Sequence, residues 1–233
     1  EQKDELEQLL RESLFERLFK ALPATNKQML AIQYRMHEHI MAGITPFYAH
    51  EQGGLRCGVP ADARDHFLDG RFMTREDHLL WIDLPNAAPY FEQRVKGGSS
   101  LFNEGELQTI RDVLLDVNDA TKRAKDAGLM PLDAQKSVGV ISFYGEQVKN
   151  ITRLIQQELQ LPHLQLRTGT VDKFQGMEMD VMIVSMVRNT PEPQGHIGFA
   201  RDYRRLNVAV SRARELCMMI GSADMFTKKE RQP

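Results

Sequence analysis

The stretch Val181-Met182-Ile183-Val184-Ser185-Met186-Val187 is apolar at every position except Ser185, and it indicates the fold class. A strand that helices cover on both faces of a parallel sheet must be apolar at nearly every position. Further strands of this kind are expected at Met29–Ile32, Leu79–Leu84, Val138–Phe143, Leu164–Val171 and Leu216–Ile220.

Segments with apolar residues at helical spacing separate these strands. Helices are expected at Asp4–Leu22, Glu38–Ala42, Asn103–Ala127, Glu146–Leu159, Tyr203–Arg212 and Ala223–Lys229. Strands that alternate with helices indicate βαβ crossovers, and therefore an α/β fold with a parallel sheet. Residues 50–77 are rich in Gly, Arg and Asp and show no sustained period. We therefore predict one domain over residues 1–233, with a solvated, loop-rich insertion at about 50–77.

The composition excludes several classes of protein. Lys and Arg number 30 against 32 Asp and Glu, so the net charge of −2 excludes a globally basic nucleic-acid coat. Two cysteines, Cys57 and Cys217, exclude a disulfide scaffold. No apolar run approaches the roughly 18 residues of a membrane span, and the charged first segment shows no signal peptide. The expected location is intracellular and cytoplasmic, or nuclear if the source is eukaryotic.

Polar residues crowd the segment Thr170–Asp180, between two of the predicted strands. Ligands of open parallel sheets bind at loops beyond the strand ends. Gly176 permits a backbone conformation or a close approach that a side chain would forbid, and Glu178 has the acceptors to bind a ribose. A polar turn with a structural glycine explains the same residues equally well on spacing alone.

Two further stretches carry arginine. On a helix, Arg205 and Arg212 of the stretch Arg204–Arg214 lie two turns apart at similar azimuths, and Arg is suited to bidentate phosphate recognition. A solvated basic face is the alternative. The stretch Tyr34-Arg35-Met36-His37 joins an aromatic ring that can stack on a base to an arginine that can reach a phosphate.

Together these stretches resemble the motifs of Superfamily 1 helicases, in the branch of the nonsense-mediated-decay RNA helicase and its DNA-helicase relatives. Gln33–His37 is similar to the fourth motif, Thr170–Arg188 to the fifth and Arg204–Arg214 to the sixth. Ser100-x-x-Asn103-x-x-Glu106 and the segment Ser13–Leu18 match as well, and order and spacing agree over about residues 13–221. The resemblance implies the C-terminal, RecA-like domain of such a helicase.

The resemblance implies that five residues of this chain contact ATP, whose Mg²⁺ the first lobe of the helicase mainly holds. Arg35 and Arg212 match arginine fingers on the γ-phosphate. Such residues raise the rate of phosphoryl transfer by roughly 10³–10⁵-fold. Tyr34 matches an aromatic residue that packs on the adenine. Gly176 and Glu178 match nucleotide contacts, with Glu178 near the ribose.

The resemblance also implies contacts to single-stranded DNA or RNA. Thr170 matches a residue that touches the nucleic-acid backbone, and Ser142 and Tyr144 lie in a strand-end motif with the same role. Phe143 stands where the family generally has Pro, so the sequence departs from the family pattern between Ser142 and Tyr144. Translocation from 5′ to 3′ is implied for the whole helicase.

The chain has no P-loop. No Gly-Lys pair occurs, and the glycine spacing of Gly53–Pro60 ends in Val59 and Pro60, which supply neither an ammonium nor a hydroxyl group. No predicted strand ends in an Asp-Glu pair placed to hold Mg²⁺. The chain is therefore expected to be the second motor lobe alone, inactive toward ATP until a P-loop lobe, in cis or in trans, supplies most of the ATP and Mg²⁺ contacts.

Other functions stay open at this level. A stand-alone, non-catalytic module that binds nucleic acid or protein would share the fold, although it would have no use for arginine fingers. The histidines and cysteines His37, His39, His50 and Cys57 form no familiar ligand grouping, so no metal site is expected. The choice between DNA and RNA is not determined.

Overall fold

The computed structural model describes residues 14–28, 30–48, 54–192 and 196–227. The chain divides into two compact units, Glu1–Ala31 and Ile32–Pro233. The first unit holds helix α2 (Leu14–Ala21) and the short 3-10 helix η1 (Ala24–Asn26). The helix expected over Asp4–Leu22 is therefore present in its second half, and its first half lies outside the described residues. All further elements belong to the second unit.

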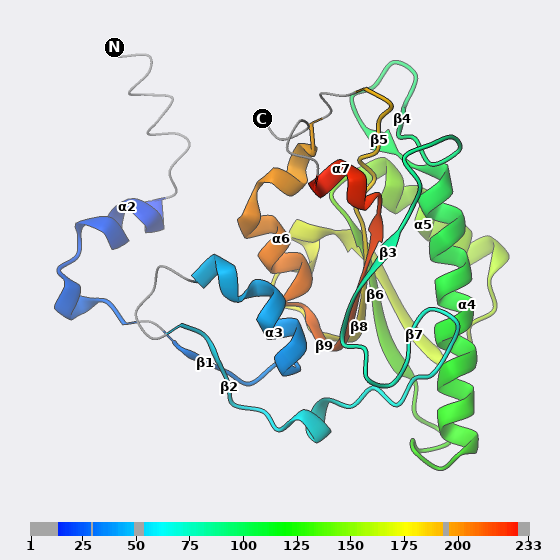
Figure 1. The fold of residues 1–233 in the computed structure, drawn as a ribbon, viewed down its shortest axis with the longest axis horizontal. Helices are drawn as coiled ribbons and strands as arrows, with labels where there is room; N and C mark the ends of the chain where they lie inside the picture. Colours follow the sequence, from blue (N-terminus) through cyan, green and yellow to red (C-terminus); the bar gives the residue numbers. More distant parts are fainter. Residues whose placement is uncertain (1–13, 29, 49–53, 193–195, 228–233) are drawn as a thin grey trace. The chain divides into compact units, whose positions relative to one another are not determined.

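A five-stranded sheet forms the centre of this unit (Figure 1). Its order is β3-β9-β8-β6-β7, and all four pairings are parallel, as the sequence pattern predicts. The strands are β3 (Leu79–Asp83), β6 (Lys136–Ser142), β7 (Leu164–Thr170), β8 (Met179–Ser185) and β9 (Ala213–Gly221).

Side chains of successive residues on the central strands enter two separate cores. On β8, Val181 and Ile183 pack in one core, and Met182 and Val184 pack in the other. This alternation is the period of two that any strand has, with both faces buried. The sheet is thus covered on both sides, which confirms the predicted α/β architecture.

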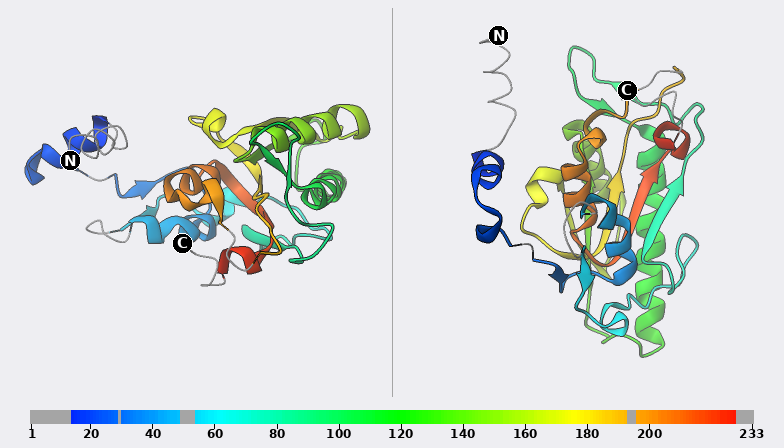
Figure 2. Two further views of the ribbon diagram at one scale, coloured as in Figure 1. Left: turned by 90° about the horizontal axis from the view of Figure 1, so that it is seen from above. Right: turned by 60° about the vertical axis from the view of Figure 1, so that its left-hand side comes forward.

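Different helices cover the two faces, as the two views of Figure 2 show. The long helix α4 (Glu104–Asp126) and α5 (Gly145–Glu158) pack on one face. Helices α3 (Glu38–Ile44) and α6 (Tyr203–Val210) pack on the other. Helix α7 (Ala223–Thr227) brings Phe226 against Trp81, with ring centroids 5.5 Å apart. None of the helices that the model describes combines the length and apolarity needed to cross a bilayer.

Short elements connect these parts, and for one of them the sequence predicts a strand, at Met29–Ile32. Of that segment only Ile32 belongs to a strand, which lies outside the five-stranded sheet, and Met29 lies outside the described residues. Strands β1 (Ile32–Gln33) and β2 (Arg56–Cys57) pair in parallel, and β4 (Gln93–Arg94) and β5 (Leu101–Phe102) form an antiparallel pair. The 3-10 helices are η2 (Thr45–Tyr48), η3 (Ala61–Arg64), η4 (Val171–Phe174) and η5 (Gly198–Arg201). Strands β2, β4 and β5 have two residues each and show no periodicity, so the sequence offers no signal for them.

The expectation that residues 50–77 form a solvated loop is wrong for the second half of that segment. His66 and Leu68 are fully buried and Met73 is 2% exposed, and Leu68 and Met73 pack in the core under α4. Isolated core residues in irregular backbone create no period, and the sequence therefore conceals them.

Candidate functional site

The predicted site residues form two groups at opposite ends of the parallel strands. Glu178 and Arg212 directly precede β8 and β9, so they lie at the amino ends of these strands. Ser142 and Thr170 are the last residues of β6 and β7, and their Cα atoms pair across the two strands. The polar segment between Thr170 and Glu178 runs from one end of the sheet to the other.

Arg35, Glu178 and Arg212 meet at the amino end. Arg35 Nε donates to Glu178 Oε1 at 2.6 Å, and the Arg35 Nη1 atom donates to the Ser211 carbonyl at 3.2 Å. Arg212 donates through Nη2 to the Ser211 hydroxyl and through Nη1 to the Met177 carbonyl, each at 3.3 Å. Two guanidinium groups from distant parts of the sequence thus share Ser211 as a common partner.

Positive charge exceeds negative charge within this group. Burial lowers the pKa of Arg212, the nearby charge of Arg35 lowers it further, and Glu178 acts in the opposite direction. One carboxylate therefore faces two guanidinium groups, and the Arg35 and Glu178 side chains are 31% and 45% exposed. An anion with several oxygens, such as a phosphate, would relieve the repulsion between the two arginines.

Gln33 and Arg64 hold the backbone of the turn that carries Arg35. The Gln33 Oε1 atom accepts from the amides of Arg35 and Met36, both at 2.9 Å. Arg64 Nε donates to the Arg35 carbonyl at 2.6 Å, and Arg64 Nη2 donates to the Tyr34 carbonyl at 3.0 Å. The sequence analysis did not identify Arg64, because it lies in the irregular segment and matches no motif.

Tyr34 and Gly176 differ in what holds them. The Tyr34 side chain is 66% exposed, and its ring lies over Gly58, where a Cβ atom would come within 2.5 Å of it. Gly176 has a φ of +84°, and no heavy atom lies within 4 Å of the place a Cβ would take. Gly176 is thus required by its left-handed backbone and not by crowding.

The predicted placement of Arg205 and Arg212 on one helix is wrong. Helix α6 ends at Val210, and Arg212 lies beyond its C-cap residue, Ser211. Arg205 bonds Asp172 at 3.1 Å and its guanidinium lies 5.1 Å from the centroid of the Phe199 ring, while Arg212 turns to the site of Arg35. Helix α6 ends because Ser211 caps it, with its amide bonded to the Asn207 carbonyl. The chain then leaves the helix, and this separates Arg212 from Arg205.

At the carboxyl end, the predicted nucleic-acid contacts are not equally accessible. Ser142 is fully buried, and its hydroxyl accepts from the Tyr144 amide at 3.3 Å. Tyr144 is 6% exposed, its ring lies 5.3 Å from that of Phe199, and burial raises its pKa. Thr170 is partly exposed. Phe143, at the position where the sequence departs from the family pattern, is 7% exposed.

A buried polar network supports this end of the sheet. Glu106 accepts from the Ser185 hydroxyl at 2.6 Å and from the Val187 amide at 2.8 Å, and Gln147 Nε2 donates to the same Ser185 hydroxyl at 3.0 Å. Burial raises the pKa of Glu106 to about 8. Because Glu106 captures the Val187 amide, β8 ends at Ser185, two residues before the end that the apolar run predicts.

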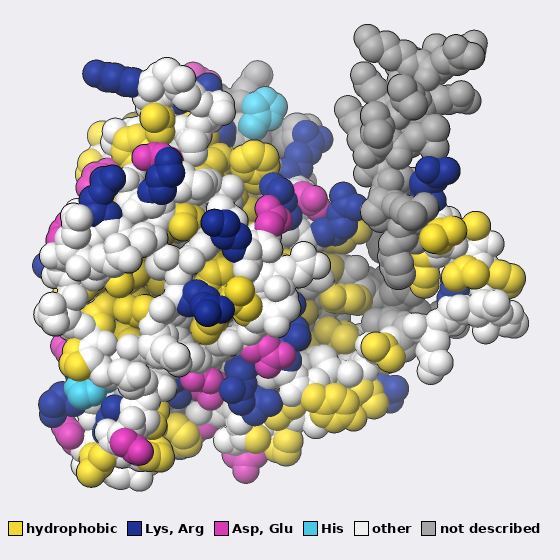
Figure 3. Space-filling model, turned by 180° about the vertical axis from the view of Figure 1, so that it is seen from behind, with side chains coloured by type: hydrophobic (Ala, Val, Ile, Leu, Met, Phe, Trp, Pro, Cys, Tyr) yellow, Lys and Arg dark blue, Asp and Glu magenta, His cyan; other side chains and the backbone are white. Residues whose placement is uncertain are grey.

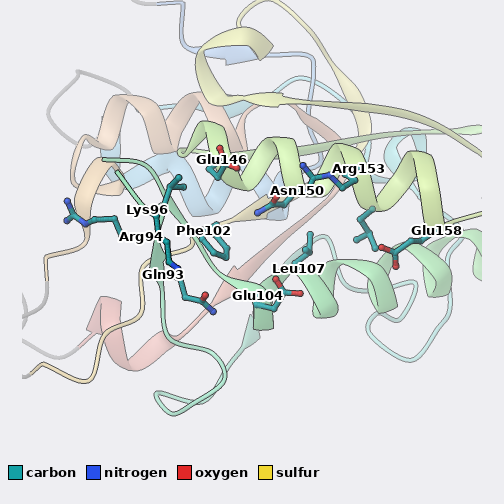
Figure 4. A pocket seen from close by; sticks show the side chains of 12 residues that line it. Gln93, Arg94, Lys96, Phe102, Glu104, Leu107, Glu146, Asn150, Arg153 and Glu158 are labelled. Atoms are coloured by element: carbon teal, nitrogen blue, oxygen red, sulfur yellow. The ribbon is translucent and has the colours of Figure 1, made fainter. Parts of the chain in front are cut away.

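A pocket lies apart from Arg35 and Arg212, between the β4–β5 hairpin and helices α4 and α5 (Figure 4). Its volume is about 540 Å³, and its charged lining residues are Arg94, Lys96, Glu104, Glu146, Arg153 and Glu158. The charges are mixed, so the pocket favours neither an anion nor a cation. Figure 3 shows a face on which the described Lys and Arg side chains likewise lie between acidic and hydrophobic ones.

The helix-covered parallel sheet, taken together with the family match, identifies a Superfamily 1 helicase domain of RecA-like fold. A family model described as an AAA domain, AAA_12, matches residues 10–224, and the chain belongs to that family.

The proteins to which the chain is similar include relatives from yeast, fly and rat. It is 28% identical over 94% of its length to DNA polymerase alpha-associated DNA helicase A of Saccharomyces cerevisiae. It is 30% identical over 95% to the regulator of nonsense transcripts 1 homolog of Drosophila melanogaster, and 32% identical over 88% to the DNA-binding protein SMUBP-2 of Rattus norvegicus. The chain spans 31%, 17% and 19% of these relatives, respectively.

Among solved structures, the chain is similar to the C-terminal domain of a possible DNA helicase from Lactobacillus plantarum WCFS1. The likeness covers 82% of this chain and 88% of that chain, with 11% identity and a TM-score of 0.39.

Proposed function

We propose that this domain is the second motor lobe of an ATP-dependent helicase, in which Arg35 and Arg212 act as arginine fingers on the γ-phosphate. The single observation that carries the proposal is the convergence of both guanidinium groups on Ser211, beside the carboxylate of Glu178. Phosphoryl transfer spreads negative charge over the equatorial oxygens, and two fixed cations stabilise that charge. Gly176 and Glu178 would contact the nucleotide, and Tyr34 would pack on its adenine.

The first lobe is required for the reaction. A P-loop lobe, in cis or in trans, would supply the lysine and the Mg²⁺ ligands that this sequence lacks. The Mg²⁺ held by that lobe would supply neutralisation of the phosphate charge. Arg35 and Arg212 would sense the nucleotide across the interface between the lobes, so that bound ATP favours the closed arrangement.

Single-stranded DNA or RNA would lie at the carboxyl ends of β6 and β7. Thr170 is the accessible side chain there, whereas the buried Ser142 would act by holding the loop of Tyr144. Contacts to phosphate and sugar carry no sequence information, so we expect translocation, 5′ to 3′, without sequence preference. The eight residues from Val171 to Glu178 would couple the nucleic-acid contact at Thr170 to the nucleotide site. The proposed location of the helicase is inside the cell.

The experiment is ATP hydrolysis, stimulated by single-stranded nucleic acid, in the helicase that carries this lobe together with its P-loop lobe. Arg35→Ala and Arg212→Ala are each expected to lower kcat by roughly 10³-fold or more. Arg111→Ala, on the exposed side of α4, is the matched control and should leave kcat unchanged. If both finger variants hydrolyse ATP like the control, the proposal is wrong.

A further inference from the structure

Three histidines from two distant segments come together beside the turn of Arg35. His37 and His39 flank the start of α3, and His78 directly precedes β3. The rings of His37 and His78 stack with centroids 3.4 Å apart, and the ring of His39 lies 4.8 Å from that of His37 and 5.5 Å from that of His78. The sequence groups only His37 and His39, because His78 lies about forty residues further along the chain.

From this geometry we propose that His37, His39 and His78 form a binding site for a divalent transition-metal ion, with Zn²⁺ as the ion that fits best. One ring nitrogen from each of the three lies within 4.8 Å of the others. Three nitrogens on a tetrahedral Zn²⁺ lie roughly 3.3 Å apart, given Zn–N bonds of about 2.0–2.1 Å. Metal binding would therefore require rotation of these side chains, above all the opening of the stacked pair His37 and His78.

Hydrogen bonds prepare one of the ligands. His78 Nδ1 lies 2.7 Å from the Glu215 carbonyl, which can only accept, so Nδ1 carries the proton and Nε2 keeps its lone pair. A backbone carbonyl in this position orients metal-bound histidines and fixes their tautomer. His37 accepts from the His39 amide through Nδ1 at 3.2 Å. A neutral imidazole that binds a metal through Nε2 carries its proton on Nδ1, so ligation by His37 would break this long capping bond.

The neighbouring His66, in contrast, is not available as a metal ligand. Its ring centroid lies 5.1 Å from that of His78, but both of its nitrogens are engaged. Nε2 bonds the Asp77 carbonyl at 2.7 Å, and Nδ1 accepts from the Leu68 amide at 3.0 Å. His66 is therefore a structural histidine that packs beside the proposed site.

The three histidines open into a pocket of about 290 Å³ that carboxylates also line. Asp65 is paired with Arg75 at 2.7 Å, whereas Glu38 and Asp62 add negative charge to the same pocket. A cation gains from this charge, and the volume leaves room for a water molecule or a carboxylate as the fourth ligand. The site is thus arranged for three protein ligands and one exchangeable position.

Metal binding would join α3 to the amino end of β3. His37 and His39 belong to the segment that follows Arg35, and His78 is bonded to the backbone of β9 at Glu215. A bound ion would therefore restrain the turn of Arg35 relative to the sheet. The metal proposal does not depend on the proposed ATP reaction.

The test is titration of the tag-free chain with Zn²⁺ by calorimetry, and with Co²⁺ by visible absorption. We expect one equivalent to bind, tetrahedral Co²⁺ absorption, and a rise in Tm with Zn²⁺. His39→Ala should weaken binding at least about 10-fold. His39 is exposed, so this variant should keep the metal-free Tm.

His196→Ala, which removes an exposed histidine outside the group, is the matched control and should bind like the wild type. No uptake by the wild-type chain would overturn the proposal. The proposal would also be overturned if His39→Ala bound the metal as tightly as the wild type, or if His39→Ala and His196→Ala lost metal affinity equally. Because the readout is metal binding, it is independent of ATP hydrolysis, and either proposal can fail alone.

Discussion

Arg35 Nε lies 2.6 Å from Glu178 Oε1, although 143 residues separate the two along the chain. This ion pair joins the turn after β1 to the residue that precedes β8. It also places the arginine matched to the fourth helicase motif directly against the acidic residue of the fifth motif. Both side chains are partly exposed, so the pair can exchange partners when a nucleotide arrives.

Glu178→Gln should change nucleotide binding more than stability. Exposed ion pairs contribute about 0–1 kcal/mol, so the free energy of unfolding should fall by less than about 1 kcal/mol. The amide keeps one acceptor but loses the charge that faces Arg35. In the complete helicase we expect a higher KM for ATP with a smaller change in kcat, measured by steady-state hydrolysis. A loss confined to kcat would contradict a ground-state contact to the nucleotide.

Arg64→Ala should impair the same site indirectly. Arg64 donates to two backbone carbonyls, those of Tyr34 and Arg35, and so acts as a positioning residue. We expect a loss of about 1 kcal/mol in the free energy of unfolding, and a drop in kcat smaller than that of Arg35→Ala. Arg64→Lys should recover only part of kcat, because a lysine lacks the planar fork that reaches both carbonyls. Full recovery by lysine would show that only the charge matters.

Gly176→Ala and Gly145→Ala form a matched pair. At both positions, no heavy atom lies within 4 Å of the added Cβ, so crowding is absent. Gly176 has a φ of +84°, which costs an L-residue about 1–2 kcal/mol. Gly145 is the first residue of α5, where alanine is favourable. Urea denaturation should show a loss of about 1 kcal/mol for Gly176→Ala and none for Gly145→Ala. Equal losses would contradict this explanation.

Glu106 should make stability fall as pH rises. Burial raises the pKa of Glu106 to about 8, against 4.5 in the unfolded chain. Between these values the folded state holds a proton that the unfolded state releases, so the free energy of unfolding decreases with pH in this window. The contribution is complete below about pH 4.5 and is lost as pH rises through about 8.

The Glu106→Gln variant keeps an acceptor for the Val187 amide and cannot ionise. The difference in unfolding free energy between the variant and the wild type should therefore grow in favour of the variant from pH 5 to pH 8, as measured by denaturant titration. Glu158→Gln, on the exposed face of α5, is the control and should follow the wild type. A constant difference across the range would show that Glu106 does not titrate there.

The α/β class, the covered faces and all five strands of the parallel sheet could be predicted from the chain, although the sequence also predicted a strand at Met29–Ile32, of which only Ile32 is in a strand, outside that sheet. Their signal is local, because a strand such as β8 is apolar at successive positions and a helix such as α4 repeats every three to four residues. The motif stretches could also be placed between these elements. Strand and helix ends were less predictable, since capture of the Val187 amide by Glu106 and capping by Ser211 depend on distant or single side chains.

Local pattern thus accounts for which segments become strands and helices, and for which motifs lie between them. It does not account for which side chains meet. Arg35, Glu178 and Arg212 come together only when α3, β8 and β9 pack. From segments with no period at all, Arg64 reaches the carbonyl of Arg35 and His78 reaches the ring of His37. The physical reason is that periodicity reports the burial of neighbours along the chain, whereas a charged site is built from contacts across the sheet, whose geometry exists only in the folded domain.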